Sequence, residues 1–264
     1  MLTRAQGARA LVLRAIPYGE SDVVVHLLVE GRGRLAAFAR GARNSARRFR
    51  GALQPFNLIE AMLAERRGAD LSSLHEASIL EGWPPLRDDL SRLAHAGYAA
   101  ELVHDLTLEG VAADALFELL CSFFARLCAA APTSSRLRAL ELLALEAAGL
   151  SPELSCCARC GAELAPGQAA FDPAAGGLAC PRCVSPGALP LTHGARLLMQ
   201  QLQRGGLEAA DAPLSADGSG RPADARGFEE AARQAAPALT AFLGHHLGRR
   251  LRSAGFIVDV SAPR

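Results

Sequence analysis

The stretches RALVLRAI, at residues 9–16, and DVVVHLLV, at residues 22–29, decide the fold of the N-terminal region. Both are short and rich in β-branched and aliphatic residues, and the turn-forming run from Pro17 to Gly19 separates them, which is typical of paired β-strands. Three more segments of this kind follow in the first 80 residues, at 34–39, 56–64 and 70–80. Five short strands predict a small closed barrel. We take the OB-fold as the prediction, with an SH3-like barrel as the alternative.

Beyond about residue 87 the apolar positions recur every three to four residues, which indicates amphipathic helices. The expected helices cover residues 87–105, 115–130, 135–148, 192–204 and 228–252. Pro237 falls inside the last of them, where we expect a kink or a short break. Residues 208–226 are rich in Ala, Asp, Gly, Pro and Ser and are expected to form a mobile loop.

These elements together predict an α+β, multidomain protein. An N-terminal five-stranded OB-fold β-barrel is followed by an α-helical domain with an inserted cysteine-rich segment. The expected divisions are residues 1–80 for the barrel, 81–150 and 191–264 for the helical domain, and 151–190 for the insert. Trp83 lies between barrel and helices, where we expect it to pack at their junction.

The basic residues gather at one place in a nearly neutral chain. The 264 residues carry a formal net charge of +1, and every basic residue other than histidine is arginine. Between Gly31 and Arg50 there is no acidic residue but there are seven arginines: Arg32, Arg34, Arg40, Arg43, Arg47, Arg48 and Arg50. Guanidinium groups match phosphate oxygens and stack on bases. This run predicts a binding site for a polyanion, with a solvated, flexible basic loop as the alternative.

Three phenylalanines interleave with these arginines or follow them. One or two of Phe38, Phe49 and Phe56 are candidates for stacking on bases, although Phe56 opens an expected strand and we favour the core for it. A second basic group, His245 and His246 followed by residues 248–252, stands near the C-terminus. We expect it to complement the dipole of the last helix, with a second phosphate-contacting patch as the alternative.

Four cysteines form two pairs, Cys157-Ala-Arg-Cys160 and Cys180-Pro-Arg-Cys183. Two such turns complete a tetrahedral Zn2+ site, so Cys157, Cys160, Cys180 and Cys183 are the expected ligands of a zinc ribbon. Four thiolates leave no open coordination position. The zinc is therefore expected to be structural and to hold the insert together rather than to do chemistry. A redox-active Cys-x-x-Cys pair is the competing interpretation.

The other three cysteines have simpler interpretations. Cys156 neighbours Cys157 and is an alternative ligand at a less common spacing, whereas Cys121 and Cys128 are expected core residues of one helix. A zinc deaminase needs a Pro-Cys-x-x-Cys element, but Ala179 precedes Cys180, and no His/Cys-x-Glu lies upstream. No other catalytic motif appears either, which predicts a protein that is not an enzyme.

The sequence also bears on the compartment. Arginines interrupt any early apolar run, so we expect no signal peptide, and no apolar stretch is long enough to suggest a membrane span. Seven cysteines, an odd number with four of them paired, favour reduced thiols over a secreted disulfide framework. We expect a cytoplasmic protein.

Several segments together resemble the RecO-type recombination mediators of bacteria. They are residues 18–22 (YGESD), 41–43, 47–51, 53–56 (LQPF), the insert at 150–183 and residues 246–249. The resemblance implies an N-terminal OB-fold, a helical domain, a zinc-binding insert and association with the nucleoid. It also implies binding of single- and double-stranded DNA, annealing of complementary strands, and help for a RecA-type recombinase in replacing the single-stranded-DNA-binding protein SSB.

The partners implied by the resemblance are RecR, the C-terminal tail of SSB and, indirectly, RecA. Members of that family often mix Lys and Arg in the basic segment, whereas this chain has only Arg, and some members lack the cysteines. The leading hypothesis is a DNA-binding and annealing mediator. Two alternatives stay open, a zinc-stapled protein-interaction adaptor with incidental DNA binding and a zinc-dependent hydrolase.

Overall fold

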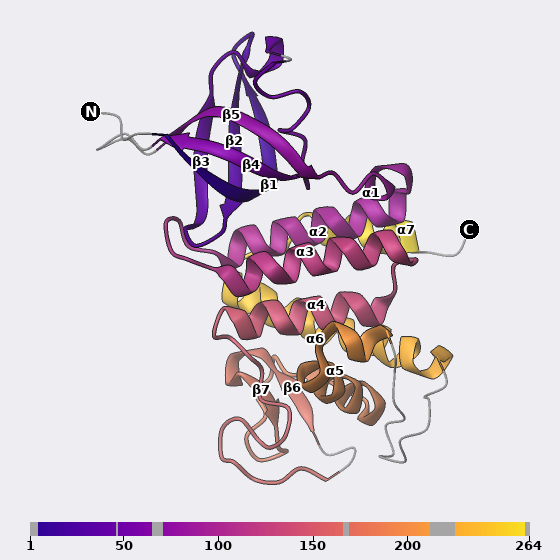
Figure 1. Ribbon diagram of the computed structural model, residues 1–264. Coiled ribbons are helices and arrows are strands. Elements are labelled where there is room, and N and C mark those ends of the chain that lie inside the picture. Colours follow the sequence, from indigo (N-terminus) through magenta and orange to yellow (C-terminus); the bar gives the residue numbers. More distant parts are fainter. Residues whose placement is uncertain (1–4, 46, 65–70, 166–168, 212–224, 262–264) are drawn as a thin grey trace. The chain divides into compact units, whose positions relative to one another are not determined.

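The computed structural model describes residues 5–45, 47–64, 71–165, 169–211 and 225–261, with side chains as far as residue 257 (Figure 1). The chain divides into two compact units, Met1–Ala130 and Ala131–Arg264. The predicted fold class is confirmed, since a closed five-stranded barrel is followed by helices and a cluster of four cysteines. The finer four-part division stays a prediction. None of the helices in the described part of the chain is long and apolar enough to cross a membrane.

The first unit begins with the barrel. Its strands are β1 (Gln6–Tyr18), β2 (Asp22–Val29), β3 (Gly33–Ala39), β4 (Leu58–Ala64) and β5 (Ser72–Glu81). The order around the barrel is β1-β2-β3-β5-β4, and β1 closes it by pairing with β4 (Figure 1). Only the pairing of β3 with β5 is parallel. This closed five-stranded arrangement agrees with the predicted OB-fold, and every expected strand overlaps an observed one.

The alternating pattern of β2 and β3 separates an inner from an outer face. Val25 and Leu27 of β2 are fully buried in the barrel core together with Ala37 of β3, whereas Phe38 and Arg34 on the outer face are half-buried. This is the period-two pattern of a strand that has one face in a core. The alternation of buried and half-buried side chains along β2 and β3 therefore shows which of them the barrel presents outward.

Three helices complete the first unit: α1 (Pro85–Asp88), α2 (Leu90–Leu106) and α3 (Asp114–Ala129). The Asp89 carboxylate caps α2 by accepting from Arg92 N at 2.7 Å. Phe124 of α3 makes edge-to-face contacts with Trp83 and Phe56, with ring centroids 5.4 and 5.6 Å apart. The predicted junction role of Trp83 and core role of Phe56 are both confirmed.

The second unit contains α4 (Ser134–Ala147), α5 (His193–Asp211), α6 (Ala225–Leu247) and α7 (Ser253–Ser261). The first three pack on one another. Three short strands, β6 (Ala170–Asp172), β7 (Gly177–Ala179) and β8 (Leu189–Pro190), form the small sheet of the cysteine-rich insert in the order β7-β6-β8. Phe171 of β6 packs against Phe242 of α6 with ring centroids 5.6 Å apart.

Two expectations about these helices are wrong, and the expected loop between them is shorter at both ends. The loop expected at 208–226 overlaps α5, which continues to Asp211 past a kink at Gly206 (φ 63°, ψ −150°), and it overlaps the start of α6 as well. Residues 212–224 lie outside the described part. Helix α6 runs through Pro237 without a break, because its packing on α4 and α5 offsets the hydrogen bond that proline removes. It ends at Leu247, where Gly248 has a φ of 67°, and α7 follows in place of its expected extension.

Candidate nucleic-acid interface and metal-binding centre

The seven arginines of the predicted polyanion site fall into two groups at opposite ends of strand β3. Arg32 and Arg34 lie in and just after the β2–β3 turn and are half-buried. The other five are exposed and follow the strand, in a segment that we name the arginine loop, residues 40–51. The predicted run is therefore not one patch. The structure brings together Arg40, Arg43, Arg47, Arg48 and Arg50.

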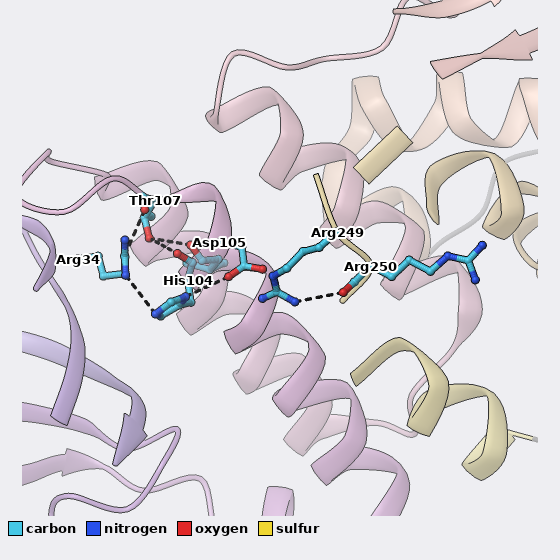
Figure 2. Close-up of polar contacts among 7 residues, drawn as sticks. Arg34, His104, Asp105, Thr107, Arg249 and Arg250 are labelled. Atoms are coloured by element: carbon cyan, nitrogen blue, oxygen red, sulfur yellow. Dashed lines mark hydrogen bonds and ion pairs between the residues drawn. The ribbon is translucent and has the colours of Figure 1, made fainter. Parts of the chain in front are cut away.

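Arg34 is engaged by the last turn of α2 and by the start of the loop between α2 and α3 (Figure 2). Its Nε donates to the carbonyl of Thr107 at 3.2 Å, and its Nη1 lies 3.2 Å from Nε2 of His104. Because a guanidinium only donates, Nε2 of His104 accepts, which leaves Nδ1 as the N–H that faces Asp105 Oδ1 at 3.1 Å. The half-buried Arg34 thus joins the barrel to the helices of the same unit, a role that the sequence pattern did not reveal.

The whole β2–β3 turn docks on this inter-helix loop. Gly31 N donates to the Asp114 carboxylate at 2.6 Å, and Gly110 N donates to the carbonyl of Arg34 at 2.9 Å. Gly33 has a φ of 69°, and a Cβ there would lie 1.7 Å from the carbonyl oxygen of Val111. Only glycine fits so close a backbone approach. This end of the barrel is therefore occupied by protein.

The arginine loop at the other end keeps a defined backbone. Gly41, in the left-handed region at φ 63°, donates to the Asp22 carboxylate at 2.7 Å, and Arg43 N donates to the carbonyl of Ser21 at 2.9 Å. The side-chain amide of Asn57 donates to the carbonyls of Gly51 and Ala52, both at 3.1 Å. Contacts at both ends of the loop therefore place its cations on a fixed scaffold.

One arginine of this loop also serves its structure. Arg48 donates through Nη2 to the carbonyl of Arg40 at 2.7 Å and through Nε to Ser45 Oγ at 3.2 Å, and its guanidinium lies 5.1 Å from the centre of the Phe49 ring. Phe49 is only 2% exposed, so its predicted availability for base stacking is wrong. Among the described residues, the guanidinium groups of Arg40, Arg43, Arg47 and Arg50 have no hydrogen-bond or ion-pair partner.

The four predicted metal ligands come together in the insert of the second unit. The Sγ atoms of Cys157, Cys160, Cys180 and Cys183 all lie within 4.8 Å of one another, and those of Cys160 and Cys180 are 3.8 Å apart. A tetrahedral zinc site with Zn–S bonds of about 2.3 Å has S–S edges of about 3.8 Å, so the cluster has the dimensions that a metal requires. The N–H of Cys180 donates to Cys157 Sγ and lowers the pKa of Cys157 to about 6.

A buried carboxylate joins the two halves of this insert. Asp172 is 1% exposed, and its Oδ1 accepts from Ala174 N and Ala175 N at 3.1 and 3.2 Å. Its Oδ2 accepts from Ser185 N, just after the second cysteine pair, and lies 3.7 Å from Nη2 of Arg159, between the first pair. Burial raises the pKa of Asp172, but its hydrogen bonds, led by those from Ser185, lower it overall.

Helix α5 grips the same insert through an arginine. Arg196 donates to three carbonyls, those of Leu154, Ser155 and Leu164, at 3.3, 2.8 and 3.0 Å. Gln200 adds a hydrogen bond to the carbonyl of Leu154 at 2.6 Å. These carbonyls flank the first cysteine pair on both sides. Arg196 and Asp172 are functional residues that sequence reasoning missed, because no local motif marks a long-range contact to backbone.

The remaining cysteines stay apart from the four-thiol cluster. Cys156 is half-buried and is not among the four residues whose Sγ atoms converge. Cys121 and Cys128, predicted as core residues, are half-buried on α3. Burial, followed by the charge of Glu118, raises the pKa of Cys121 to about 12, and burial also raises the pKa of Cys128. A raised pKa lowers the fraction of thiolate, which is the reactive form.

One histidine of the C-terminal basic group packs against an aromatic ring. The ring of His246 packs against Phe242 with centroids 4.5 Å apart, and burial followed by the charge of His245 lowers the pKa of His246. The expected interaction of this group with the dipole of the helix stays a prediction. Beyond the helix, Nη1 of Arg249 donates to the carbonyl of Arg250 at 3.1 Å (Figure 2). The second phosphate-contacting patch stays a prediction.

The fold and its two candidate sites define a class: a small barrel that presents a basic loop, followed by helices and an insert whose four cysteines could hold a metal ion. Two family models match the chain, Recombination protein O N terminal over residues 4–83 and Recombination protein O C terminal over residues 87–254. The chain belongs to the RecO family of DNA repair proteins.

Curated relatives support this assignment along the entire length. The DNA repair protein RecO of Anaeromyxobacter dehalogenans (strain 2CP-C) is 48% identical over 253 residues, which cover 95% of this chain and 94% of the relative. The RecO protein of Myxococcus xanthus (strain DK1622) is 41% identical over 256 residues, covering 95% of this chain and 96% of the relative. That of Geobacter sulfurreducens is 36% identical over 248 residues, with 94% and 95% covered.

Proposed function

We propose that this protein is a non-enzymatic mediator that binds single- and double-stranded DNA and anneals complementary strands. In this proposal it acts with a RecR-type partner and the C-terminal tail of SSB, in the cytoplasm on the nucleoid, to help a RecA-type recombinase onto SSB-coated DNA. Membership of the RecO family of DNA repair proteins supports the general role. The DNA-binding, annealing and loading steps rest on the arguments that follow.

The observation that carries the proposal is the arginine loop. It presents five exposed arginines within residues 40–50, an interval with no acidic residue, on a backbone tied to the barrel at both ends. Cations held in this way neutralise phosphates, and they do so without reading base edges. Annealing requires this combination, because the repulsion between two strands must fall while their bases stay free to pair.

We also propose that the four thiolates hold Zn2+ as a structural ion. Soft thiolate ligands in a tetrahedral set favour zinc over magnesium or calcium. Four protein ligands leave no position for a water or a substrate, so the ion stabilises the insert and does not provide a hydrolytic centre. X-ray absorption at the zinc edge tests this directly. Four Zn–S bonds are expected, and a zinc–oxygen bond would support the hydrolase alternative.

The role of the arginine loop is tested by a charge-matched pair of variants. Arg43→Gln/Arg47→Gln removes two exposed cations from the loop, and Arg204→Gln/Arg233→Gln removes two exposed cations from the second unit. Only the first variant is expected to weaken DNA binding. Its slope of log affinity against log salt should fall by about 1.4 for single strands, since each lost phosphate contact contributes about 0.7. Equal affinities for both variants would contradict the proposal.

The annealing step is tested with complementary oligonucleotides coated with SSB. The protein should accelerate pairing, the acceleration should fade as salt rises, and the loop variant should lose it. If the protein is folded and metal-loaded yet gives no acceleration, the adaptor alternative gains support. Tight binding to the SSB tail beside weak DNA affinity would then identify the adaptor.

A further inference from the structure

An exposed aromatic side chain lies beside the arginine loop. Tyr18, the last residue of β1, is 61% exposed, although tyrosine carries a large apolar ring. Its ring meets that of Phe38 on β3 edge to face, with centroids 5.8 Å apart and an interplanar angle of 81°. The contact holds the tyrosine ring while most of its surface stays open to solvent.

The strand register places both rings on the outer surface of the barrel. Val23, Val25, Ala37 and Ala39 point into the core, so their neighbour Phe38 points outward. Tyr18 is paired with Asp22, and Phe38 with Val24. Outer-face positions of β1, β2 and β3 therefore form a continuous surface with an aromatic pair at one end.

This end of the surface is the one that carries the arginine loop. The Asp22 carboxylate, across from Tyr18, accepts from Gly41 N at 2.7 Å, and Arg43 N donates to the carbonyl of Ser21 at 2.9 Å. Arg40 follows Phe38 by two residues and is exposed. The aromatic pair and the loop cations thus share one rigid frame. Glu20 in the β1–β2 turn is an exposed acid close by, whereas the Asp22 carboxylate is already engaged by backbone.

The side chains of this surface indicate which kind of ligand it would bind. An open aromatic ring beside several cations suits a ligand that alternates planar rings with negative charges, which describes single-stranded nucleic acid. In a duplex the base faces are already stacked on one another and are not available to a side chain. We propose that Tyr18, steadied by Phe38, stacks on an unpaired base of single-stranded DNA whose phosphates lie on the arginine loop. This deepens the proposed function and rests on it.

The stacking role is tested with three oligonucleotide ligands: a single strand, the same strand with abasic sites, and a duplex. Tyr18→Ala removes the ring, and Tyr18→Phe keeps it. Leu108→Ala removes another exposed apolar side chain of the first unit, which is 70% exposed. Tyr18→Ala should bind the single strand about 5- to 150-fold more weakly, since that is the range for the loss of one stacked base. Its affinity for the abasic strand and for the duplex should match that of the unchanged protein.

The two rescue and control variants sharpen the result. Tyr18→Phe is expected to restore single-strand affinity, and Leu108→Ala is expected to leave it unchanged. The fluorescence of 2-aminopurine in an oligonucleotide should be quenched when the unchanged protein or Tyr18→Phe binds, but not when Tyr18→Ala binds. These three results together would support stacking of the Tyr18 ring on a base.

Two outcomes overturn it. Unchanged single-strand affinity in Tyr18→Ala means that the ring does not stack. An equal loss for all three ligands means that the tyrosine only positions the arginine loop. Either leaves the proposed function standing, provided the Arg43/Arg47 variant loses DNA affinity. If the unchanged protein binds none of the ligands, the proposed function itself fails, so the two failures are distinguishable.

Discussion

The arginine loop and the cysteine-rich insert are two segments with little regular structure that use their charged side chains in opposite ways. In the insert, Asp172 is 1% exposed and its oxygens accept three N–H groups, and Arg196 of helix α5 donates to three carbonyls of the insert. These charged side chains are engaged in hydrogen bonds with the backbone of the insert. In the arginine loop the backbone is held from outside, by Asp22 and Asn57, and most of the cations face solvent.

The comparison shows which charges are available for a ligand. An exposed cation without a partner costs little to keep and contributes little to stability, so its value lies in long-range attraction of a polyanion. A buried carboxylate satisfied by backbone N–H groups is costly to remove, because those donors are left without partners. Substitutions in the insert should therefore act on folding and metal binding, and substitutions in the loop should act on DNA affinity.

The largest effect is expected for removal of the metal ligands themselves. Cys157→Ser/Cys183→Ser takes one thiolate from each pair, and a site with two remaining thiolates no longer holds the ion. Metal content measured by atomic absorption should fall from one ion per chain to background. The control, Cys121→Ser/Cys128→Ser, changes two half-buried thiols of α3 and should keep the full metal content. Loss of metal from the control would show that the four metal ligands are wrongly assigned.

Asp172→Asn is expected to have the next largest effect. It replaces an acceptor oxygen by an amide that donates toward an N–H, and so it loosens the connection between the two cysteine pairs. Metal affinity, measured by competition with a chelator, should fall by about 10- to 100-fold, the usual cost of losing a residue that orients metal ligands. Arg159→Ala, which removes only a half-exposed ion-pair partner at 3.7 Å, should change it far less. Equal effects would mean that charge, and not the backbone contacts, carries the role of Asp172.

The sequence predicted most of this architecture because the relevant signals are local. The β-branched and aliphatic run at residues 22–29 identified β2 with the bounds that the structure shows, and the spacing of the two cysteine pairs identified the four thiols that converge. Such patterns depend on the geometry of a strand or of a tight turn, which a short segment specifies without help from the rest of the fold.

What the sequence did not reveal depends on distant contacts. Arg34 resembles the other arginines of its run in the sequence, yet the fold places it against His104 and Thr107, 70 and 73 positions away. Phe49 interleaves with cations but is drawn into the barrel core. Helix α6 passes through Pro237 because neighbouring helices support it. Local propensity is overridden in each case by packing that no single segment contains.

Substitution of Arg34 tests whether the seven arginines between Gly31 and Arg50 fall into two groups with different roles. Arg34→Met keeps the aliphatic stem but removes donors to Thr107 and His104, and it should lower the free energy of unfolding by about 1.5–3 kcal/mol, the usual scale for hydrogen bonds from a charged group. DNA affinity should hardly change. Arg43→Met should show the reverse, with unaltered stability and weaker DNA binding. Denaturant unfolding and DNA titration measure both quantities. If Arg34→Met weakens DNA binding more than Arg43→Met does, the division of the run into two groups is wrong.

The smallest expected effect concerns pH and the end of the barrel that holds Arg34. Burial lowers the pKa of His26, and the nearby charges of His104, Arg14 and Arg34 lower it further, with Glu109 opposing them. His26 and His104 lie with ring centroids 5.5 Å apart. In the unfolded chain a histidine titrates near its ordinary pKa of about 6.5.

Below a pH of about 6.5, His26 therefore binds a proton more readily in the unfolded state than in the folded state. The free energy of unfolding that is present at neutral pH is lost as the pH falls through the pKa of His26 in the folded state. Between pH 7.5 and 5.5 the melting temperature of the unchanged protein should fall by more than that of His26→Gln. His75→Gln, which changes an exposed histidine of β5, should follow the unchanged protein. An identical decline in all three would mean that His26 does not contribute. A smaller decline in His26→Gln alone would establish that the stability of this docked end of the barrel depends on the protonation of one half-buried histidine.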